Sequence, residues 1–289
     1  MNVDLLLVPY DTALRGWRMG AGPERLVEAG LISRLEALGH AVTPSLVETE
    51  RDAPAEIGTA FELMRAVAQR VRAAVAGGRF PLVLSGNCST ASGTLAGLAP
   101  ASRAVFWFDA HADCNTPETT TSGFLDGTAL ATALGWCWRE MAGTIPGFQP
   151  VPDHSVVLLG TRDVDPLEHE LVARSAVRVL SPDSLRGDGW TRELASIRQH
   201  ADVAYVHCDL DALDPSEGQA NPFPVAGGLT VAEIESAVRE IGRSVPIQAA
   251  AVTAYAPEYD TDGRVAQAAL RIIEALLAVV PPQSPAGLP

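Results

Sequence analysis

Short apolar runs alternate with longer stretches of helical periodicity along most of the chain. An apolar run bounded by glycine, proline or polar residues is typical of a buried strand, whereas apolar positions three and four apart are typical of a helix. The pattern predicts strands at residues 3–8, 42–46, 81–84, 104–108, 155–159, 177–180, 203–208 and 247–253. It predicts helices at residues 24–38, 57–75, 128–134, 191–200, 231–241 and 264–280, and one more after Glu168. Such alternation favours βα units repeated around an eight-stranded parallel sheet.

The segments between these elements differ in character. Residues 115–127 form a long polar loop after the strand at 104–108, and a loop of that length in a compact domain is usually functional. Residues 136–153 contain several Pro and Gly and are expected to be irregular and exposed. The Pro-rich residues 281–289 are expected to be disordered, which leaves one predicted domain, residues 1–280.

The composition narrows the class of function. With 289 residues, of which 47% are hydrophobic, the chain is long enough to bury a large core. Its formal net charge of −14 argues against nucleic acid or an anionic membrane as partner, because both are bound by clustered Lys and Arg. No apolar run reaches the roughly 18–20 residues of a membrane span, and the N-terminus lacks the features of a signal peptide, so a cytoplasmic protein is expected. The four cysteines are too few for a disulfide scaffold and are expected to be free thiols.

Metal-ligand residues follow the apolar run at 104–108. Asp109, His111 and Asp113 occupy alternate positions, and in extended backbone such side chains share one face. Two carboxylates and an imidazole would then converge within a few ångströms. This donor set suits a divalent cation such as manganese or zinc better than a soft metal.

A second cluster of the same kind follows the strand at 203–208. Asp209 and Asp211 again alternate, so two strand ends together offer five ligands, enough for two cations. Carboxylates crowded at one sheet edge without a cation would repel one another, which favours metal binding over capping or turn roles. For Asp214, directly before Pro215, a turn role is the better interpretation. His207 is expected to pack, or to act as a hydrogen-bond partner behind the ligands.

Several motifs together, in one order, resemble the arginase (ureohydrolase) family. They are Asp109-Ala-His-Ala-Asp113, the loop Asn115-Thr-Pro-Glu-Thr-Thr-Thr-Ser-Gly123, Arg162-Asp-Val-Asp-Pro-Leu-Glu168, Asp209-Leu-Asp-Ala-Leu-Asp-Pro215 and Gly227-Gly-Leu-Thr230. The resemblance extends from about Gly20 to Pro257. It implies a three-layer α/β/α fold, a manganese pair at the sheet edge, and hydrolysis of a guanidino or amidino carbon by metal-bound hydroxide. It also implies a homo-oligomer, commonly a trimer or hexamer.

The resemblance assigns roles to individual residues. Asp109 and Asp209 would bridge both metals, while His111 and Asp211 would complete one site. Asp113 would ligate the other metal and deprotonate the attacking water, whose pKa a metal lowers towards neutrality.

A substrate clamp is implied in the same way. Asn115, Thr120 and Ser122 would bind the α-carboxylate of an amino acid. Asp165 and Glu168 would bind its α-ammonium group. From the residues alone, the Thr-rich loop and the Asp165–Glu168 segment are equally well explained as helix N-terminal caps.

The chain also departs from the family's pattern. In Ser85-Gly-Asn-Cys-Ser89, Cys88 stands where the family has a metal-ligating histidine, and a thiol is a soft ligand for manganese. One tightly bound manganese ion is therefore expected, with the second weak or absent. Ala254 replaces the glutamate that holds the guanidinium, Phe124 replaces an asparagine, and Asp126 replaces the acid–base histidine. Asp126 is the candidate to act in that histidine's place and to supply the missing carboxylate.

These departures argue against ordinary arginase activity, because a substrate guanidinium without a partner loses charge-assisted hydrogen bonds. The cysteine-for-histidine change is similar to that in N-hydroxyarginine hydrolases of antibiotic biosynthesis, which release hydroxyurea and ornithine. A small guanidino substrate, with a modified arginine first among the candidates, is the leading hypothesis. The alternatives are another guanidino, amidino or amide substrate, and a non-catalytic protein that keeps the fold.

Overall fold

The computed structural model describes residues 1–50, 55–98 and 102–281. Its centre is an eight-stranded sheet with the order β4-β1-β5-β10-β9-β6-β7-β8, and every pair of neighbouring strands is parallel. The strands are β1 (Asn2–Val8), β4 (Ala41–Leu46), β5 (Phe80–Ser85), β6 (Arg103–Phe108), β7 (Val156–Leu159), β8 (Arg178–Leu180), β9 (Val203–Asp209) and β10 (Ile247–Thr253). All eight predicted strands are therefore confirmed, with ends shifted by at most one residue.

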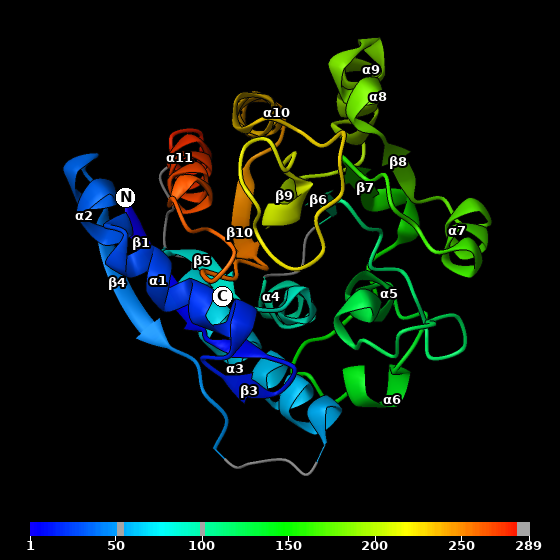
Figure 1. Cartoon of the computed structure of the whole chain (residues 1–289), viewed down its shortest axis with the longest axis horizontal. Coiled ribbons are helices and arrows are strands. Elements are labelled where there is room, and N and C mark those ends of the chain that lie inside the picture. Colours follow the sequence, from blue (N-terminus) through cyan, green and yellow to red (C-terminus); the bar gives the residue numbers. More distant parts are fainter. Residues whose placement is uncertain (51–54, 99–101, 282–289) are drawn as a thin grey trace.

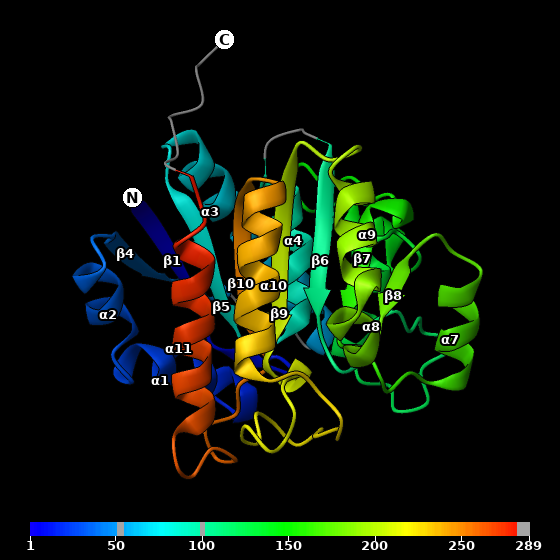
Figure 2. The same ribbon diagram turned by 90° about the horizontal axis from the view of Figure 1, so that it is seen from above.

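Helices cover both faces of the sheet, which makes three layers (Figures 1 and 2). One face packs against α1 (Gly22–Glu28), α2 (Leu31–Ala37), α9 (Asp188–Ile197), α10 (Val231–Ser244) and α11 (Arg264–Leu277). The opposite face packs against α3 (Glu56–Ala76), α4 (Ala91–Gly97), α5 (Ala129–Ala133) and α7 (Pro166–Ala173). This is the α/β/α arrangement that the alternating sequence pattern predicts.

Most positions of the central strands are apolar because each strand has a core on both sides; the exceptions include His207 in β9 and Gln248 in β10. In β6, Phe106 and Phe108 point into one core, while Val105 and Trp107 point into the other. The period of two along a strand separates them, and all four side chains are fully buried. Continuous apolar runs in the sequence therefore mark strands buried on both faces.

Several elements differ from the sequence prediction. The helix expected at residues 24–38 is split into α1 and α2 at Gly30, which has a left-handed backbone (φ 97°). The stretch 136–153 is not wholly irregular and exposed, since it contains α6 (Arg139–Ala142) and buries Ala142 and Ile145. The helix expected after Glu168 begins earlier, at Pro166, because proline is well suited to a first helical turn.

Several short elements were not predicted, among them α4, α6, α8 (Pro182–Arg186), the 3-10 turn η1 (Arg18–Ala21), and the two-residue strands β2 (Tyr10–Asp11) and β3 (Leu14–Arg15). They are too short to give a periodic signal. The tail expected to be disordered lies, from residue 282 on, outside the described residues. Within the described ranges, no helix combines the length and apolar character needed to cross a membrane.

The topology places four loops at one edge. Strands β5, β10, β9 and β6 are neighbours at the centre of the sheet, although β5 and β6 precede β9 and β10 by about a hundred residues. Their carboxyl ends meet at the lower edge in Figure 2, where the loops after β9 and β10 lie. Ligands of open parallel sheets bind beyond this end of the strands.

Candidate metal centre

A cavity of about 270 Å³ opens at the carboxyl ends of the four central strands. The loop after β5 contributes Cys88, and the loop after β6 contributes His111 and Asp113. The loops after β9 and β10 contribute Asp209 and Ala254. Asp109 is buried and does not line the cavity. The cavity walls contain every other predicted site residue: Cys88, His111, Asp113, Asn115, Thr120, Ser122, Asp126, Asp165, Glu168, Asp209 and Asp211.

The ligands after β6 converge, but not by strand alternation. The strand ends at Phe108, and the chain from Asp109 on is a bent loop in which Asp113 has a left-handed backbone (φ 51°). The prediction of an extended segment is therefore wrong. Hydrogen bonds hold the bend instead: Asp109 Oδ1 accepts from the His111 amide at 2.7 Å, and the Asp113 carbonyl accepts from the Leu130 amide at 2.9 Å.

The second cluster is shaped by a 3-10 turn. Asp209 is the last residue of β9, and its Oδ1 accepts a hydrogen bond from the Asp211 amide at 2.8 Å. Asp211 lies in η5 (Leu210–Ala212), and its Oδ1 accepts from the Ala110 amide at 3.2 Å. That last bond ties the two ligand-bearing loops to each other. Asp214 is a turn residue as expected, because its carboxylate accepts hydrogen bonds from backbone amides on both sides of the following loop.

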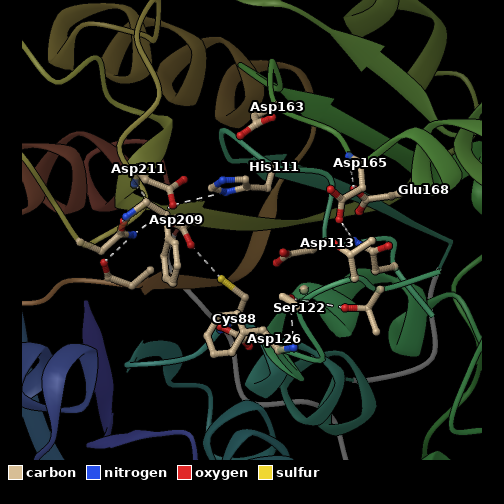
Figure 3. Close-up of a pocket in the computed structure, with 18 of the residues that line it drawn as sticks. Cys88, His111, Asp113, Ser122, Asp126, Asp163, Asp165, Glu168, Asp209 and Asp211 are labelled. Carbon is tan, nitrogen blue, oxygen red and sulfur yellow. Dashed lines mark hydrogen bonds and ion pairs between the residues drawn. The ribbon is translucent and has the colours of Figure 1, made fainter. Parts of the chain in front are cut away.

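One potential metal cluster contains Asp109, His111 and Asp211, whose ligand atoms all lie within 4.8 Å of one another. His111 Nδ1 is 3.5 Å from Asp211 Oδ2, a contact drawn in Figure 3, and 3.3 Å from Asp109 Oδ1. Burial lowers the pKa of His111, but its contacts with the two carboxylates outweigh that and raise the pKa to about 12. The ligand atoms of these three residues therefore converge closely enough to share one cation.

The other cluster contains Cys88, Asp109 and Asp113, also within 4.8 Å of one another. Cys88 is 1% exposed, and its sulfur lies 3.0 Å from Asp209 Oδ2, to which the thiol donates. Burial raises the pKa of the thiol well above its usual value, and the carboxylate of Asp209 raises it further. Burial likewise raises the pKa of Asp113, with Asp109 adding to the rise.

The donor set fits a pair of divalent cations. Four carboxylates are between 1% and 8% exposed, namely Asp109, Asp113, Asp209 and Asp211. So many buried acidic groups need either protons or cations, since their mutual repulsion in a desolvated site is large. The cluster with His111 has only oxygen and nitrogen donors, which suit manganese, whereas the cluster with Cys88 includes a soft donor.

Asp126 faces the loop that carries Cys88. Its Oδ2 accepts hydrogen bonds from the Cys88 amide at 2.9 Å and from Asn87 Nδ2 at 3.1 Å, and its Oδ1 accepts from the Ser89 amide at 2.8 Å. Burial nevertheless raises the pKa of Asp126 to about 7. The carboxylate lines the cavity, but its oxygens are already occupied by the loop, so its catalytic role stays a prediction.

The expected clamp residues also line the cavity. Asn115 Nδ2 donates to Asp165 Oδ2 at 3.1 Å, and the hydroxyls of Thr120 and Ser122 are 3.4 Å apart. Glu168 accepts from the Cys114 amide at 2.6 Å through Oε1 and from the Asp165 amide at 3.2 Å through Oε2. The capping interpretation and the cavity-lining interpretation of this segment are therefore compatible.

Sequence reasoning missed three contributors. Asn221 Nδ2 donates to Asp211 Oδ2 at 3.0 Å and so fixes a predicted ligand. Asp163 lines the cavity between the clamp and His111. Thr253 lies between Cys88 and His207, with its hydroxyl 3.1 Å from the sulfur and 3.2 Å from the imidazole Nε2. The only signal in the sequence was indirect: Asn221 lies in a long loop without periodicity, which favours a functional role.

Comparison with known proteins agrees with this geometry. The sequence profile of the arginase family matches residues 1–278. An arginase of Bacillus caldovelox is 32% identical over 299 residues, covering 95% of this chain and 97% of the relative. The crystal structure of an arginase from Bacillus cereus superposes with a TM-score of 0.86 at 29% identity, covering 96% and 98% of the two chains. An agmatine ureohydrolase of Thermoplasma volcanium shares the fold, with a TM-score of 0.72 at 18% identity, over 96% and 89%.

Proposed function

The chain belongs to the arginase family, whose members hydrolyse amidine C–N bonds, and on that premise we propose that it is a manganese-dependent hydrolase of a guanidino amino acid. The leading substrate is a modified arginine such as N-hydroxyarginine. Water adds to the guanidino carbon, the bond from that carbon to the ornithine nitrogen breaks, and hydroxyurea and ornithine are released. The leaving nitrogen takes up a proton, so that it departs as an amine.

One observation carries the proposal. Both potential metal clusters and the clamp residues face a single cavity of about 270 Å³. When bound, divalent cations activate water and polarise the group under attack. Asp109, His111 and Asp211 would hold one ion, and Cys88, Asp113 and Asp209 would be ligands of the other.

Asp113 is suited to accept the proton of the attacking water. Its carboxylate is 8% exposed, lies in the cavity and is surrounded by other acidic groups that favour its protonated form. A base works best when its pKa approaches the working pH, and such neighbours shift a carboxyl in that direction. The hydrogen bonds from α5 to the Asp113 carbonyl fix the residue's position.

The amino-acid end of the substrate would bind at the clamp residues. Asn115, Thr120 and Ser122 offer an amide and two hydroxyls to a carboxylate. Asp165 and Glu168 offer negative charge to an ammonium group. Both acids also accept hydrogen bonds from the protein, Asp165 from Asn115 Nδ2 and Glu168 from two backbone amides.

The test is a screen of purified, manganese-loaded protein against arginine, N-hydroxyarginine, agmatine and other guanidino compounds, with ornithine and amine release as the readout. Ornithine release from N-hydroxyarginine, abolished by a chelator and restored by manganese, is the expected result. Absence of hydrolysis of every guanidino and amidino compound, with metal bound, would refute the proposal. We further propose a homo-oligomer in the cytoplasm, as the family resemblance suggests, and analytical ultracentrifugation measures the oligomeric state.

A further inference from the structure

Part of the cavity lining is apolar. Met19 and Ala254 are buried in one small cluster, and Phe124 packs against it. The ring of Phe223 lies 5.6 Å from that of Phe124 and 6.5 Å from the imidazole of His111, measured between centroids. All four side chains line the cavity. We call Met19, Phe124, Phe223 and Ala254 the apolar wall.

This wall adjoins the metal centre. The ring of Phe223 lies edge-on to that of His111, and Ala254 lines the same cavity as Cys88 and Asp209. A guanidino amino acid held by the clamp with its reacting carbon at the metals would therefore place its guanidino group beside the wall. The wall offers no side chain that could accept a hydrogen bond or balance a positive charge.

Most acidic groups of the cavity have other partners. Those of the two metal clusters would face the cations. Asp126 accepts three hydrogen bonds from the Cys88 loop, and Asp163 lies two residues from Asp165, in the segment that carries the clamp acids. The face of Phe223 already has a cation over it, because the guanidinium of Arg18 lies 5.7 Å from the ring centroid and 3.1 Å from the buried Asp11. A second cation would gain little from this ring.

From the apolar wall we infer that the enzyme acts on guanidino groups that are uncharged at the working pH and discriminates against guanidinium cations. The inference rests on the proposed function and concerns the charge of its substrate. The guanidinium of arginine has a pKa above about 12, so it stays a cation at the working pH and would face the wall without a partner. An electronegative oxygen on the guanidine lowers its basicity, so that the neutral form is available near neutral pH.

Four amino acids with the same clamp groups test this. N-hydroxyarginine and canavanine carry an oxygen on the guanidine and lose their proton readily, whereas arginine and N-methylarginine remain cations. We expect kcat/KM for the first pair to exceed that for the second by about 10- to 100-fold, the cost of an unmade charge-assisted hydrogen bond. The ratio of kcat/KM for canavanine to kcat/KM for arginine should rise with pH until canavanine is fully neutral. Titrations of the enzyme itself affect both substrates and cancel in this ratio.

A matched pair of variants tests the wall itself. Ala254→Glu adds a carboxylate to it, and Ala254→Gln adds the same bulk without charge. We expect the first to shift preference towards arginine by about tenfold or more, and the second to leave the preference unchanged. Both substitutions meet the same backbone, so strain at Ala254 (φ 60°) cancels between them.

The outcomes separate the two proposals. Equal or better turnover of arginine than of N-hydroxyarginine and canavanine would overturn the inference and leave the proposed hydrolase intact, as would equal effects of the two Ala254 variants. Turnover of N-methylarginine at the rate of N-hydroxyarginine would show that bulk rather than charge is recognised, which also overturns it. If no compound reacts, the proposed function fails, and the inference fails with it unless calorimetry shows canavanine binding more tightly than arginine.

Discussion

Replacing Cys88 by histidine is expected to raise the manganese content of the protein from about one ion per chain towards two. In the structure the thiol donates a hydrogen bond to Asp209 Oδ2 and lies 3.1 Å from the Thr253 hydroxyl. A cation in this cluster needs the thiolate, and burial, together with Asp209, raises the thiol pKa well above its usual value. A neutral imidazole has no such proton to lose and is the better donor to manganese.

The magnitude follows from the number of donors. Cys88 is one of four groups available to the second ion, beside Asp109, Asp113 and Asp209. Changing a partner that only supports a ligand costs about 10–100-fold in metal affinity, or about 1.4–2.8 kcal/mol. Cys88 would be a direct ligand, so having a poor donor at this position in place of histidine should lower the affinity for the second ion by at least as much. Elemental analysis after loading with manganese and dialysis measures the ions retained, and a titration gives the two affinities.

Cys88→Ala is the matched control, because it removes the sulfur without adding an imidazole and should retain one ion, as the unmodified protein does. The ion beside His111 should survive dialysis in all three proteins. Two tightly held manganese ions in the unmodified protein would refute the reasoning and would make Cys88 a packing residue at the end of β5. Near-ultraviolet circular dichroism checks that the variants are folded.

Three further predictions concern the clamp and the acids of the site. Asp113→Asn should lower kcat by about 10²–10⁴-fold, the range of general-base effects, with an unchanged unfolding curve; full activity would contradict the proton-acceptor role. Agmatine, which lacks the α-carboxylate, should be a far poorer substrate than its amino-acid counterpart, because each unmet charge-assisted bond from Asn115, Thr120 or Ser122 costs about 1.5–3 kcal/mol; equal kcat/KM values would remove the clamp. Burial raises the pKa of Glu168 to about 7, so between about pH 4.5 and 7 the folded state keeps a proton that the unfolded state has lost. The free energy of unfolding of the metal-free protein should therefore fall as the pH rises through this range, by roughly 2–3 kcal/mol from this group. Urea unfolding at pH 5 and 7.5 measures the fall, and Glu168→Gln should lack this contribution; the same slope in both proteins would show that other groups cause it.

The residue pattern was sufficient to predict the strands of the sheet and to propose ligands at its edge. Segments buried on both faces, such as Val203–Asp209 and Ile247–Thr253, appear in the sequence as mainly apolar runs between more polar stretches. Ligand-type residues at the ends of those runs must meet at one sheet edge if the strands are parallel, whatever the local backbone. This is why Asp109 and Asp209 were found, although the expected extended geometry of Asp113 was wrong.

The order of the strands and the contacts across loops were decided only by the tertiary structure. That β5 and β10 are neighbours, so that Cys88 meets Thr253 and Asp209, depends on packing between segments more than a hundred residues apart. The same holds for the hydrogen bonds from the Cys88 loop to Asp126, which turn a supposed catalytic acid towards backbone amides. Local periodicity has no information on such pairings, because it reports only which face of an element is buried.

The apolar wall shows the division most clearly. The sequence identified Phe124 and Ala254 as departures from a family pattern, but it gave no reason to join them to Met19 and Phe223, which come from a 3-10 turn and from a loop without periodicity. Side chains from four distant segments form one surface only when the sheet brings their loops together. The sequence thus determined the chemical groups that are available at this edge, whereas the fold determined which of them face the substrate, since that depends on long-range packing rather than on neighbours along the chain.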